Sequence, residues 1–360
     1  MKNVSLPHAW GATRAKCVAL TTLFALFATV CSGLEFYVPP DGYDTNSGTE
    51  GSPFLTMSKA RDAVREALPD ASEGIDVWFS EGTYYFPEAV EFGPDDSGSE
   101  SVPVRYMGMN GETVDFSGAR SFENLVWSVH SGEIMKASIG TGITCDVMFA
   151  NGTQQVMARY PNFDPDAVVL NGTASDAASR DKAEGWADPS TGFVRGLHSK
   201  RWGGNSYRIT GKNAFNNLSM EWVGDNNRGS GLHAEFKMVE NIFEELDAPG
   251  EWFYDEGEGA LYFYPPEGVD LASVEIELAT TEELIRIVGT SDEKVGNLTF
   301  DNLTFSKTHR TLFTSTYEGL NRSDWKVARK GTVYIQDADS LTISNSIFDH
   351  VCVGGQCDLS

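Results

Sequence analysis

The sequence predicts an all-β protein built around a parallel β-helix, with a helical cap at the N-terminal end and an inserted β-rich subdomain. From Ile75 onward, short apolar segments such as IDVWF, TYYF and TVDFSG are separated by abrupt turns, which suits a coiled parallel sheet with an apolar inner face. The segment 298–305 is similar to the segment 341–348, which lies 43 residues later. Between these regions, residues 125–279 have a different texture, rich in Trp, Gly and Asn.

Residues 1–33 are predicted to be a signal peptide. Lys2, Arg14 and Lys16 form a positive segment, residues 18–30 are mostly apolar, and Cys31-Ser32-Gly33 offers small residues for cleavage. The alternative is an uncleaved anchor helix, but the apolar run is shorter than the roughly 20 residues that span a bilayer. We therefore expect a secreted, extracellular protein that has no membrane contact after signal cleavage.

Residues 34–124 are predicted to form the N-terminal cap and the first rungs, a rung being one turn of the coiled sheet. Apolar residues recur at helical spacing over about 57–68, where Thr56 can cap the helix and Pro69 can end it. Such a cap would cover the apolar interior and the strand edges of the first rung.

Residues 125–279 are predicted to be the inserted β-rich subdomain, with one short helix near 177–186, and residues 280–360 to form further rungs. Because a rung takes roughly half of 43 residues, the repeat spacing fits either one rung plus an insertion or two rungs. Asn302 and Asn345 occupy matching positions, where their amides can bond to neighbouring rungs.

The composition is strongly acidic, with 52 Asp and Glu against 27 Lys and Arg and a net charge of −25. Such a surface repels nucleic acids and anionic membranes, so neither is an expected partner. It also argues weakly against a polyanionic substrate such as pectate, unless a cation bridges the two. Solubility in an extracellular medium is an equally good explanation of the charge.

No cofactor and no metal site are predicted. The acidic turn at 41–48 lacks the terminal bidentate Glu of a calcium loop, and turn chemistry explains it better. After the signal three cysteines remain, Cys145, Cys352 and Cys357, and the last two either close a small loop or are free thiols. Six N-x-S/T sequons fit a secreted glycoprotein, although Asn297 and Asn302 are better explained by the strand–turn repeat.

Several segments resemble one known family: ARYPN at 158–162, WADP at 186–189, YRITGK at 207–212, NNR at 226–228, the whole of 240–266, and RSDW at 322–325. Together they resemble the secreted glycoside hydrolase family that includes α-L-fucosidases and xylanases, over nearly all of the mature chain. The resemblance implies a right-handed parallel β-helix, of the pectin lyase-like kind, that acts on a polysaccharide or oligosaccharide. Because members of the family continue for many rungs beyond the position of Asp349, it also implies that C-terminal rungs are missing and that the chain is an incomplete, inactive fragment.

The candidate substrate-binding residues are His198, Trp202, Arg228, His233, Glu244 and Glu245. Trp202 offers a flat face for a sugar ring, and the His and Arg side chains can bond to hydroxyls. Glu244 and Glu245 belong to an acidic run, and a charged, solvated surface explains such a run more often than catalysis does. Glycoside hydrolysis needs two carboxyl groups about 5 Å or about 6.5–9.5 Å apart. Sequence spacing does not define that distance, so no catalytic residue is assigned.

Three activities remain open from the sequence. The first is glycoside hydrolysis, and the second is non-catalytic glycan binding by a cell-surface β-helix protein. The third is a polysaccharide lyase, which requires calcium and a basic proton abstractor, and no basic cluster stands out. The sequence does not define an oligomeric state.

Overall fold

The computed structural model describes residues 33–201, 203–223, 231–310 and 330–351, and the backbone of 317–319 and 326–328. The predicted signal peptide up to residue 32 lies outside these residues, as do Trp202, Arg228, Cys352 and Cys357. Within the described residues the protein is mostly β, with only two short α-helices, so the predicted all-β class is confirmed. No helix in this part of the chain is long and apolar enough to cross a membrane.

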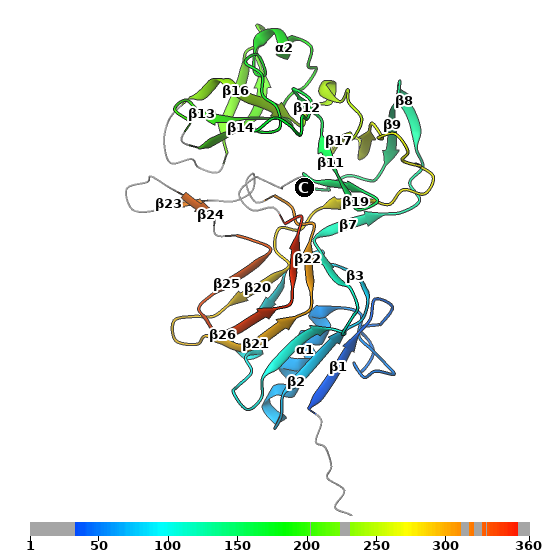
Figure 1. The fold of residues 1–360 in the computed structure, drawn as a ribbon, viewed down its shortest axis with the longest axis vertical. Coiled ribbons are helices and arrows are strands. Elements are labelled where there is room, and N and C mark those ends of the chain that lie inside the picture. Colours follow the sequence, from blue (N-terminus) through cyan, green and yellow to red (C-terminus); the bar gives the residue numbers. More distant parts are fainter. Residues whose placement is uncertain are drawn as a thin grey trace, which may run out of the picture. The chain divides into compact units, whose positions relative to one another are not determined.

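Three sheets contain only parallel strand pairs (Figure 1). The first sheet consists of β1 (Leu34–Val38), β2 (Ile75–Phe79), β5 (Val104–Gly108), β21 (Val295–Asp301) and β26 (Ala338–Ser344). The second consists of β3 (Gly82–Tyr85), β6 (Val114–Ser117), β22 (Thr304–Ser306) and β27 (Ile347–Asp349). The third consists of β4 (Val90–Phe92), β20 (Ile285–Val288) and β25 (Val333–Gln336).

The chain visits these sheets in a fixed order: β2, β3, β4, then β5, β6, β20, then β21, β22, β25. Each such circuit adds one strand to each sheet. The 43-residue repeat is one circuit paired with the next, because Leu298 aligns with Leu341 and Phe300 with Ile343 in parallel register. The repeat spacing is therefore one circuit plus an insertion, which contains the paired strands β23 (Tyr317–Gly319) and β24 (Lys326–Ala328).

One apolar core lies between the three sheets and is shared by all of them. Because residues alternate along a strand, one side of each strand faces the core, and aromatic side chains from successive circuits stack there. Tyr106 and Phe300 stack at 5.5 Å between ring centroids, and Phe116 meets Phe305 edge-on at 5.8 Å. Each such pair contributes about 0.5–1.5 kcal/mol beyond the area that it buries.

The turns of successive circuits are joined by asparagine side chains. Asn302 and Asn345 have φ values of 54° and 49°, a left-handed conformation that Asn tolerates better than most residues. The Asn302 amide donates to the carbonyl oxygens of Gly108 and Met109 at 3.1 and 3.0 Å, and the Asn345 amide donates to Asp301 Oδ1 at 2.8 Å. The predicted bonding of these amides to neighbouring turns is confirmed.

The predicted N-terminal helix is α1 (Met57–Ala67), which covers one end of the core. Thr56 caps it as predicted, since its hydroxyl accepts a hydrogen bond from the Lys59 N–H at 3.1 Å. Its buried residues are Met57, Ala60 and Val64. In the acidic turn before the helix, the Asp44 carboxylate accepts hydrogen bonds from the backbone N–H groups of Leu55 and Thr56 at 2.9 Å.

Between β6 and β20 the chain leaves the three sheets and forms the inserted region. β7 (Ala119–Phe122) and β19 (Ile276–Ala279) stand at its two ends and pair antiparallel, so its first strand precedes the expected start at residue 125. A mixed sheet contains β7 and β19 with β8 (Ser128–Ser131), β9 (Ile134–Ser138), β10 (Met148–Ala150), β11 (Thr153–Met157), β17 (Glu251–Asp255) and β18 (Ala260–Phe263). An antiparallel sheet contains β12 (Arg159–Tyr160), β13 (Phe193–His198), β14 (Gly204–Lys212), β15 (Leu218–Trp222) and β16 (Leu232–Glu240). The predicted short helix is α2 (Arg180–Glu184).

The chain leaves the circuits of parallel strands in two excursions, one after β6 and one after β22. Both start at the same corner, which is the end of the second sheet where these two strands finish. β6 leads into the inserted region, and its neighbour β22 leads into the segment that precedes β25. Their first and last residues are hydrogen-bonded: Gly118 N–H donates to the Ser306 carbonyl at 3.0 Å, and His309 N–H donates to the Thr281 carbonyl at 2.9 Å. Residues far apart in the sequence therefore meet beside the second sheet.

Candidate active site

The side of the second sheet that faces away from the core is polar. Asp115 and Ser117 flank the core residue Phe116 in β6, so they point to the opposite side of the sheet. In the parallel register Ser117 aligns with Ser306 of β22, and Ser306 aligns with Asp349 of β27. Ser117 and Ser306 are 0% and 2% exposed, so this outer side is covered rather than open to solvent.

Asp115 is a half-buried carboxyl group with incomplete hydrogen bonding. Burial raises its pKa, against the lowering influence of the nearby Ser306 hydroxyl and the Lys307 ammonium, and Asp349 adds to the rise. Among the described residues, Asp115 Oδ1 and Ser306 Oγ are both buried without a hydrogen-bond partner of normal geometry. These two polar atoms influence each other but make no hydrogen bond of normal geometry, so they mark a place where a ligand or water can bind.

Lys307 supplies the positive charge beside Asp115. Its ammonium lies 2.6 and 2.8 Å from the two carboxylate oxygens of Glu277, which comes from β19 of the inserted region. Glu277 is 2% exposed, so this ion pair is screened little by solvent. The pair joins the end of β22 to the inserted region across the candidate site.

Tyr85, at the end of β3, extends the polar face. Its hydroxyl lies 3.3 Å from both Glu275 and Glu277, and Ser121 Oγ donates to Glu275 at 3.1 Å. Burial, with the charge of Glu277, raises the pKa of Tyr85. Tyr85 therefore keeps its proton and acts as a hydrogen-bond donor.

Asp349 provides a second carboxylate on the same face. Its Oδ1 lies 2.8 Å from His350 Nδ1, and the His350 ring packs edge-on against Phe149 of β10 at 5.3 Å. The Asp349 side chain is 55% exposed, so it is far more accessible to water than Asp115.

The two carboxyl groups differ in exposure, because Asp115 is half-buried and Asp349 is 55% exposed. A carboxyl group with a raised pKa, as at Asp115, is suited to donating a proton. Strands of a sheet are about 4.8 Å apart, and Asp115 lies two strands across and two residues along from Asp349, so their backbones are about 12 Å apart. This separation leaves room between the side chains for the water molecule of an inverting mechanism.

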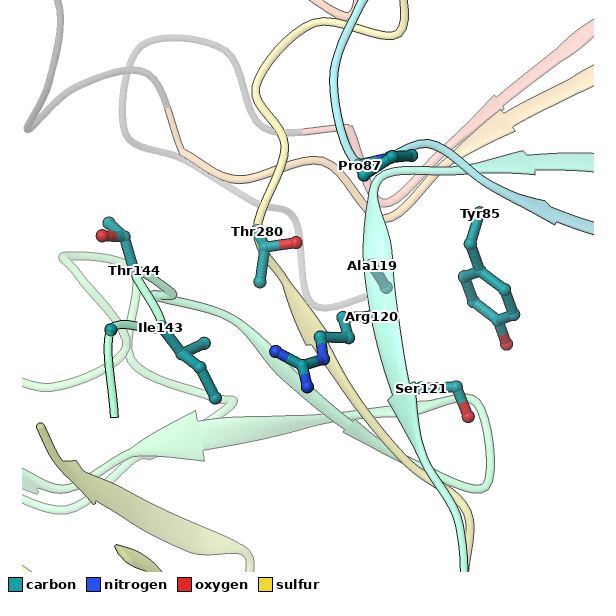
Figure 2. A pocket seen from close by; sticks show the side chains of 9 residues that line it. Tyr85, Pro87, Ala119, Arg120, Ser121, Ile143, Thr144 and Thr280 are labelled. Carbon is teal, nitrogen blue, oxygen red and sulfur yellow. The ribbon is translucent and has the colours of Figure 1, made fainter. Parts of the chain in front are cut away.

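A cavity of about 630 Å³ lies next to this face, around the start of β7 (Figure 2). It is lined by Tyr85, Pro87, Ala119, Arg120, Ser121, Gly142, Ile143, Thr144 and Thr280. Figure 2 shows Tyr85 on one side of β7, and Arg120 extending on the other side toward Ile143 and Thr280. Tyr85 belongs to both the cavity and the polar face, whereas Arg120 points away from Glu277, because Arg120 pairs with Leu278 and Ser121 pairs with Glu277.

A buried ionic network fixes the second excursion to the inserted region. Arg310 donates to Asp146 Oδ2 at 2.7 Å and to Glu240 Oε1 at 3.1 Å, and Arg195 approaches Glu240 at 3.5 Å. Burial by itself raises the pKa of Glu240, but the positive charges of Arg310 and Arg195 outweigh it and hold the pKa below its usual range. Since Lys307 precedes Arg310 by three residues, the network also positions the lysine of the candidate site.

The predicted binding residues His198 and His233 lie near each other, because His198 aligns with Leu232 across β13 and β16. His198 Nδ1 accepts from the Lys200 N–H at 2.9 Å, and His233 Nδ1 accepts from the Glu235 N–H at 3.1 Å. Both rings therefore hold local backbone in place at the end of β16 farther from Glu240. The predicted partners Trp202 and Arg228 lie outside the described residues, so the role of this group in binding stays a prediction.

Glu244 and Glu245 follow the other end of β16 and face different surroundings. Glu245 is 5% exposed and accepts from Trp186 Nε1 at 2.6 Å and Lys182 Nζ at 3.0 Å, which indicates a structural role. Glu244 accepts from the Ala187 N–H at 2.7 Å and lines a second cavity of about 970 Å³. That cavity also contains His130, Thr141, Gly142, Asp188, Thr191, Phe243, Phe253, Asp255, Glu256, Gly257, Glu258 and Tyr262.

The sequence reasoning missed Asp115, Ser306, Lys307 and Asp349, although a signal was present. Three of the four strands of the second sheet end in the similar triplets FSG at 116–118, FSK at 305–307 and FDH at 348–350. Aligning these triplets by circuit puts their polar residues in one column beside Asp115. Glu277 has no such signal, because it reaches the site only through the pairing of β7 with β19.

Comparison with known proteins identifies a shared fold. No protein-family model matches the chain. Over 87 residues it is 33% identical to the uncharacterized protein YwoF of Bacillus subtilis (strain 168), which is 24% of this chain and 16% of that protein. A solved structure titled as a glycoside hydrolase matches 89% of this chain with a TM-score of 0.70 and 20% identity. The chain spans 62% of that structure's length, and at this identity the similarity establishes the fold alone.

A second solved structure, the complex of XylC with xylose, matches 76% of this chain and 35% of that one. Its TM-score is 0.36 at 14% identity, which is too low to support an argument about this protein.

Proposed function

We propose that the chain is a secreted glycoside hydrolase that acts on a polysaccharide or oligosaccharide and is built on a right-handed parallel β-helix. Three parallel sheets visited in a fixed order, with in-register pairing between circuits, support the β-helix. The fold shared with a glycoside hydrolase supports the class of enzyme. The signal-like residues 1–33 and the six sequons support secretion.

The observation that carries the proposal is the environment of Asp115. It is a half-buried carboxyl group with a raised pKa and an unpartnered buried oxygen, on the same sheet face as a second, accessible carboxylate. A surface carboxylate that serves only solubility has no reason to be covered and left without a partner.

In the proposed reaction Asp115 protonates the glycosidic oxygen as the bond from that oxygen to the anomeric carbon breaks. Asp349 takes a proton from a water molecule, and the water oxygen attacks the anomeric carbon from the opposite face, with inversion. Tyr85 donates a hydrogen bond to the substrate. Lys307 stays paired with Glu277 and limits the build-up of negative charge beside Asp115.

The test compares three Asp→Asn variants of the full chain on a panel of neutral aryl glycosides and of xylan- and fucose-containing polysaccharides, with new reducing ends as the readout. Asp115→Asn and Asp349→Asn should each lower the rate by on the order of 100-fold or more. Asp339→Asn is the matched control, because Asp339 is a 67% exposed carboxylate on β26 of the first sheet, paired with Lys294 at 3.0 Å. It should retain the wild-type rate.

Equal rates for Asp115→Asn and Asp339→Asn would show that the second sheet is not the catalytic face. Glycan binding without any new reducing ends would identify the non-catalytic alternative. A product with near-ultraviolet absorbance would identify a lyase. The lyase is the weaker alternative because the lysine beside Asp115 is held by both oxygens of Glu277 and is not placed to abstract a proton.

A further inference from the structure

Nine of the described residues line the cavity around the start of β7. Among these nine, Arg120 is the one that carries a charge, and no Asp or Glu is present. The others are small, apolar or hydroxyl-bearing, with Ser121, Thr144, Thr280 and Tyr85 as the side-chain hydrogen-bonding groups. This lining contrasts with a chain that carries a net charge of −25.

Arg120 is exposed, and its guanidinium lies 4.7 Å from the centroid of the Phe122 ring. Stacking on the ring holds the group in place and leaves the donors at its edge available. Among the residues that the structure describes, no hydrogen bond or ion pair of the Arg120 side chain is found. Two other arginines with partly exposed side chains do meet carboxylates: Arg65 meets Asp96 and Arg105 meets Asp76.

We infer that this cavity binds the carboxylate of an acidic sugar, with Arg120 as the residue that selects it. The planar fork of a guanidinium matches the two oxygens of a carboxylate, and a charge-assisted pair of this kind is about twice as strong as a neutral hydrogen bond. A cavity of about 630 Å³ is large enough to hold a sugar ring together with its substituents. The hydroxyls of Thr144 and Thr280, near Arg120 in Figure 2, are placed to bond to the hydroxyls of the ring.

The strongly negative net charge is compatible with this ligand. At physiological ionic strength, charges on the surface are screened over about 8 Å, so a single carboxylate in the cavity interacts mainly with Arg120. A polymer with a charge on every sugar would still be repelled by the rest of the surface. We therefore expect the ligand to be a glycan that carries an isolated acidic sugar.

This inference rests on the proposed function, because it makes the acidic sugar part of the hydrolysed substrate. Tyr85 lines the cavity and also contacts Glu277 of the candidate active site. Arg120 lies on the other side of β7 from Tyr85, so an acidic sugar bound at Arg120 would occupy a subsite separated by β7 from the bond that Asp115 and Asp349 cleave (Figure 2).

The experiment measures binding rather than turnover. The full chain is titrated by NMR with the methyl glycosides of glucuronate and galacturonate, and with methyl glucoside and methyl galactoside, which differ only at C6. The wild type should bind at least one uronide about tenfold more tightly than its neutral counterpart. In Arg120→Met that preference should fall to less than about threefold, while binding of the neutral sugar stays unchanged.

Arg208→Met is the matched control. Arg208 is also exposed on a strand and also stacks on a phenylalanine, Phe193 at 4.9 Å, but it does not line the cavity. It should keep the wild-type preference, and both variants should keep the wild-type circular dichroism spectrum.

The inference would be overturned if the wild type bound uronides and neutral sugars equally, or if the preference for uronides survived in Arg120→Met. It would also be overturned if the wild type bound none of the four glycosides. The two proposals fail separately. Hydrolysis of glycans without a preference for acidic sugars would contradict this inference alone. Uronide binding that depends on Arg120, without any hydrolysis, would contradict the proposed function alone.

Discussion

Replacing Arg310 by methionine should destabilise the protein strongly, because Arg310 neutralises two buried carboxylates. The side chains of Arg310, Asp146 and Glu240 are each 7% exposed, so solvent screens their interactions little. Removing one partner from a buried ion pair typically lowers the free energy of unfolding by about 3–5 kcal/mol. Here two carboxylates lose their shared partner, so we expect the Arg310→Met variant at the upper end of that range.

Thermal and urea unfolding of the full chain provide the assay. In a chain of this size 1 kcal/mol corresponds to about 2 °C in Tm, so Tm should fall by roughly 6–10 °C. Arg105→Met is the matched control, because Arg105 binds Asp76 through two hydrogen bonds of 2.6 and 2.7 Å but is 46% exposed. Its loss should cost no more than about 1 kcal/mol.

A second substitution separates charge burial from lost packing. In the Arg310→Met background, Asp146→Asn removes a buried charge that has lost its arginine partner, so it should raise the free energy of unfolding. If the double variant were no more stable than Arg310→Met, or if Arg310→Met cost no more than Arg105→Met, the network would not carry the electrostatic role assigned to it.

Two further predictions concern single side chains. Burial raises the pKa of Glu251 from 4.5 to about 7, so the folded protein holds a proton that the unfolded chain has released. This contribution to the free energy of unfolding is present below pH 4.5 and is lost, by up to about 3 kcal/mol, as the pH rises to 7. Urea unfolding at about pH 4.5 and 7.5 should show this loss in the wild type and not in Glu251→Gln, and an equal loss in both would contradict it. Asn302→Ala should lose about 1–2 kcal/mol, because its amide donates two hydrogen bonds and its φ is 54°. Asn302→Gly should recover the backbone part of that loss, and a glycine variant as unstable as the alanine variant would contradict the backbone argument.

The circuits of parallel strands were predictable because their signal is local. Each strand is a short segment of alternating residues between turns. The similar segments that begin at 298 and 341 lie one circuit apart, so the segments that are similar in sequence also pair with each other. The helix α1 was predictable for the same reason, since Thr56 and the spacing of Met57, Ala60 and Val64 lie within one segment.

The candidate site was not predictable in the same way, because it combines residues from different circuits and from both excursions. Asp115 and Lys307 become neighbours only once β6 pairs with β22, and Glu277 joins them only once β19 pairs with β7. Glu245 shows the same dependence on distant residues. Its place in an acidic run suggests a binding surface, and its role in binding stays a prediction, but its hydrogen bonds with Trp186 and Lys182, about 60 residues earlier, are not visible in that run.

The position of the candidate site at one corner has a physical reason. Each circuit of short strands is stabilised by the circuits on either side of it. A strand within a sheet therefore cannot gain or lose residues without breaking the register. The connection at a corner can gain residues at little cost, because the entropic cost of closing a loop rises only slowly with the length of the loop. The pairing of β7 with β19 also keeps the two ends of the inserted region adjacent. Both excursions leave the corner beside the second sheet, so the Lys307–Glu277 pair lies next to Asp115 without disturbing the aromatic core behind it. The proposed division of roles follows: the sheet carries the acid, and the excursions select the sugar.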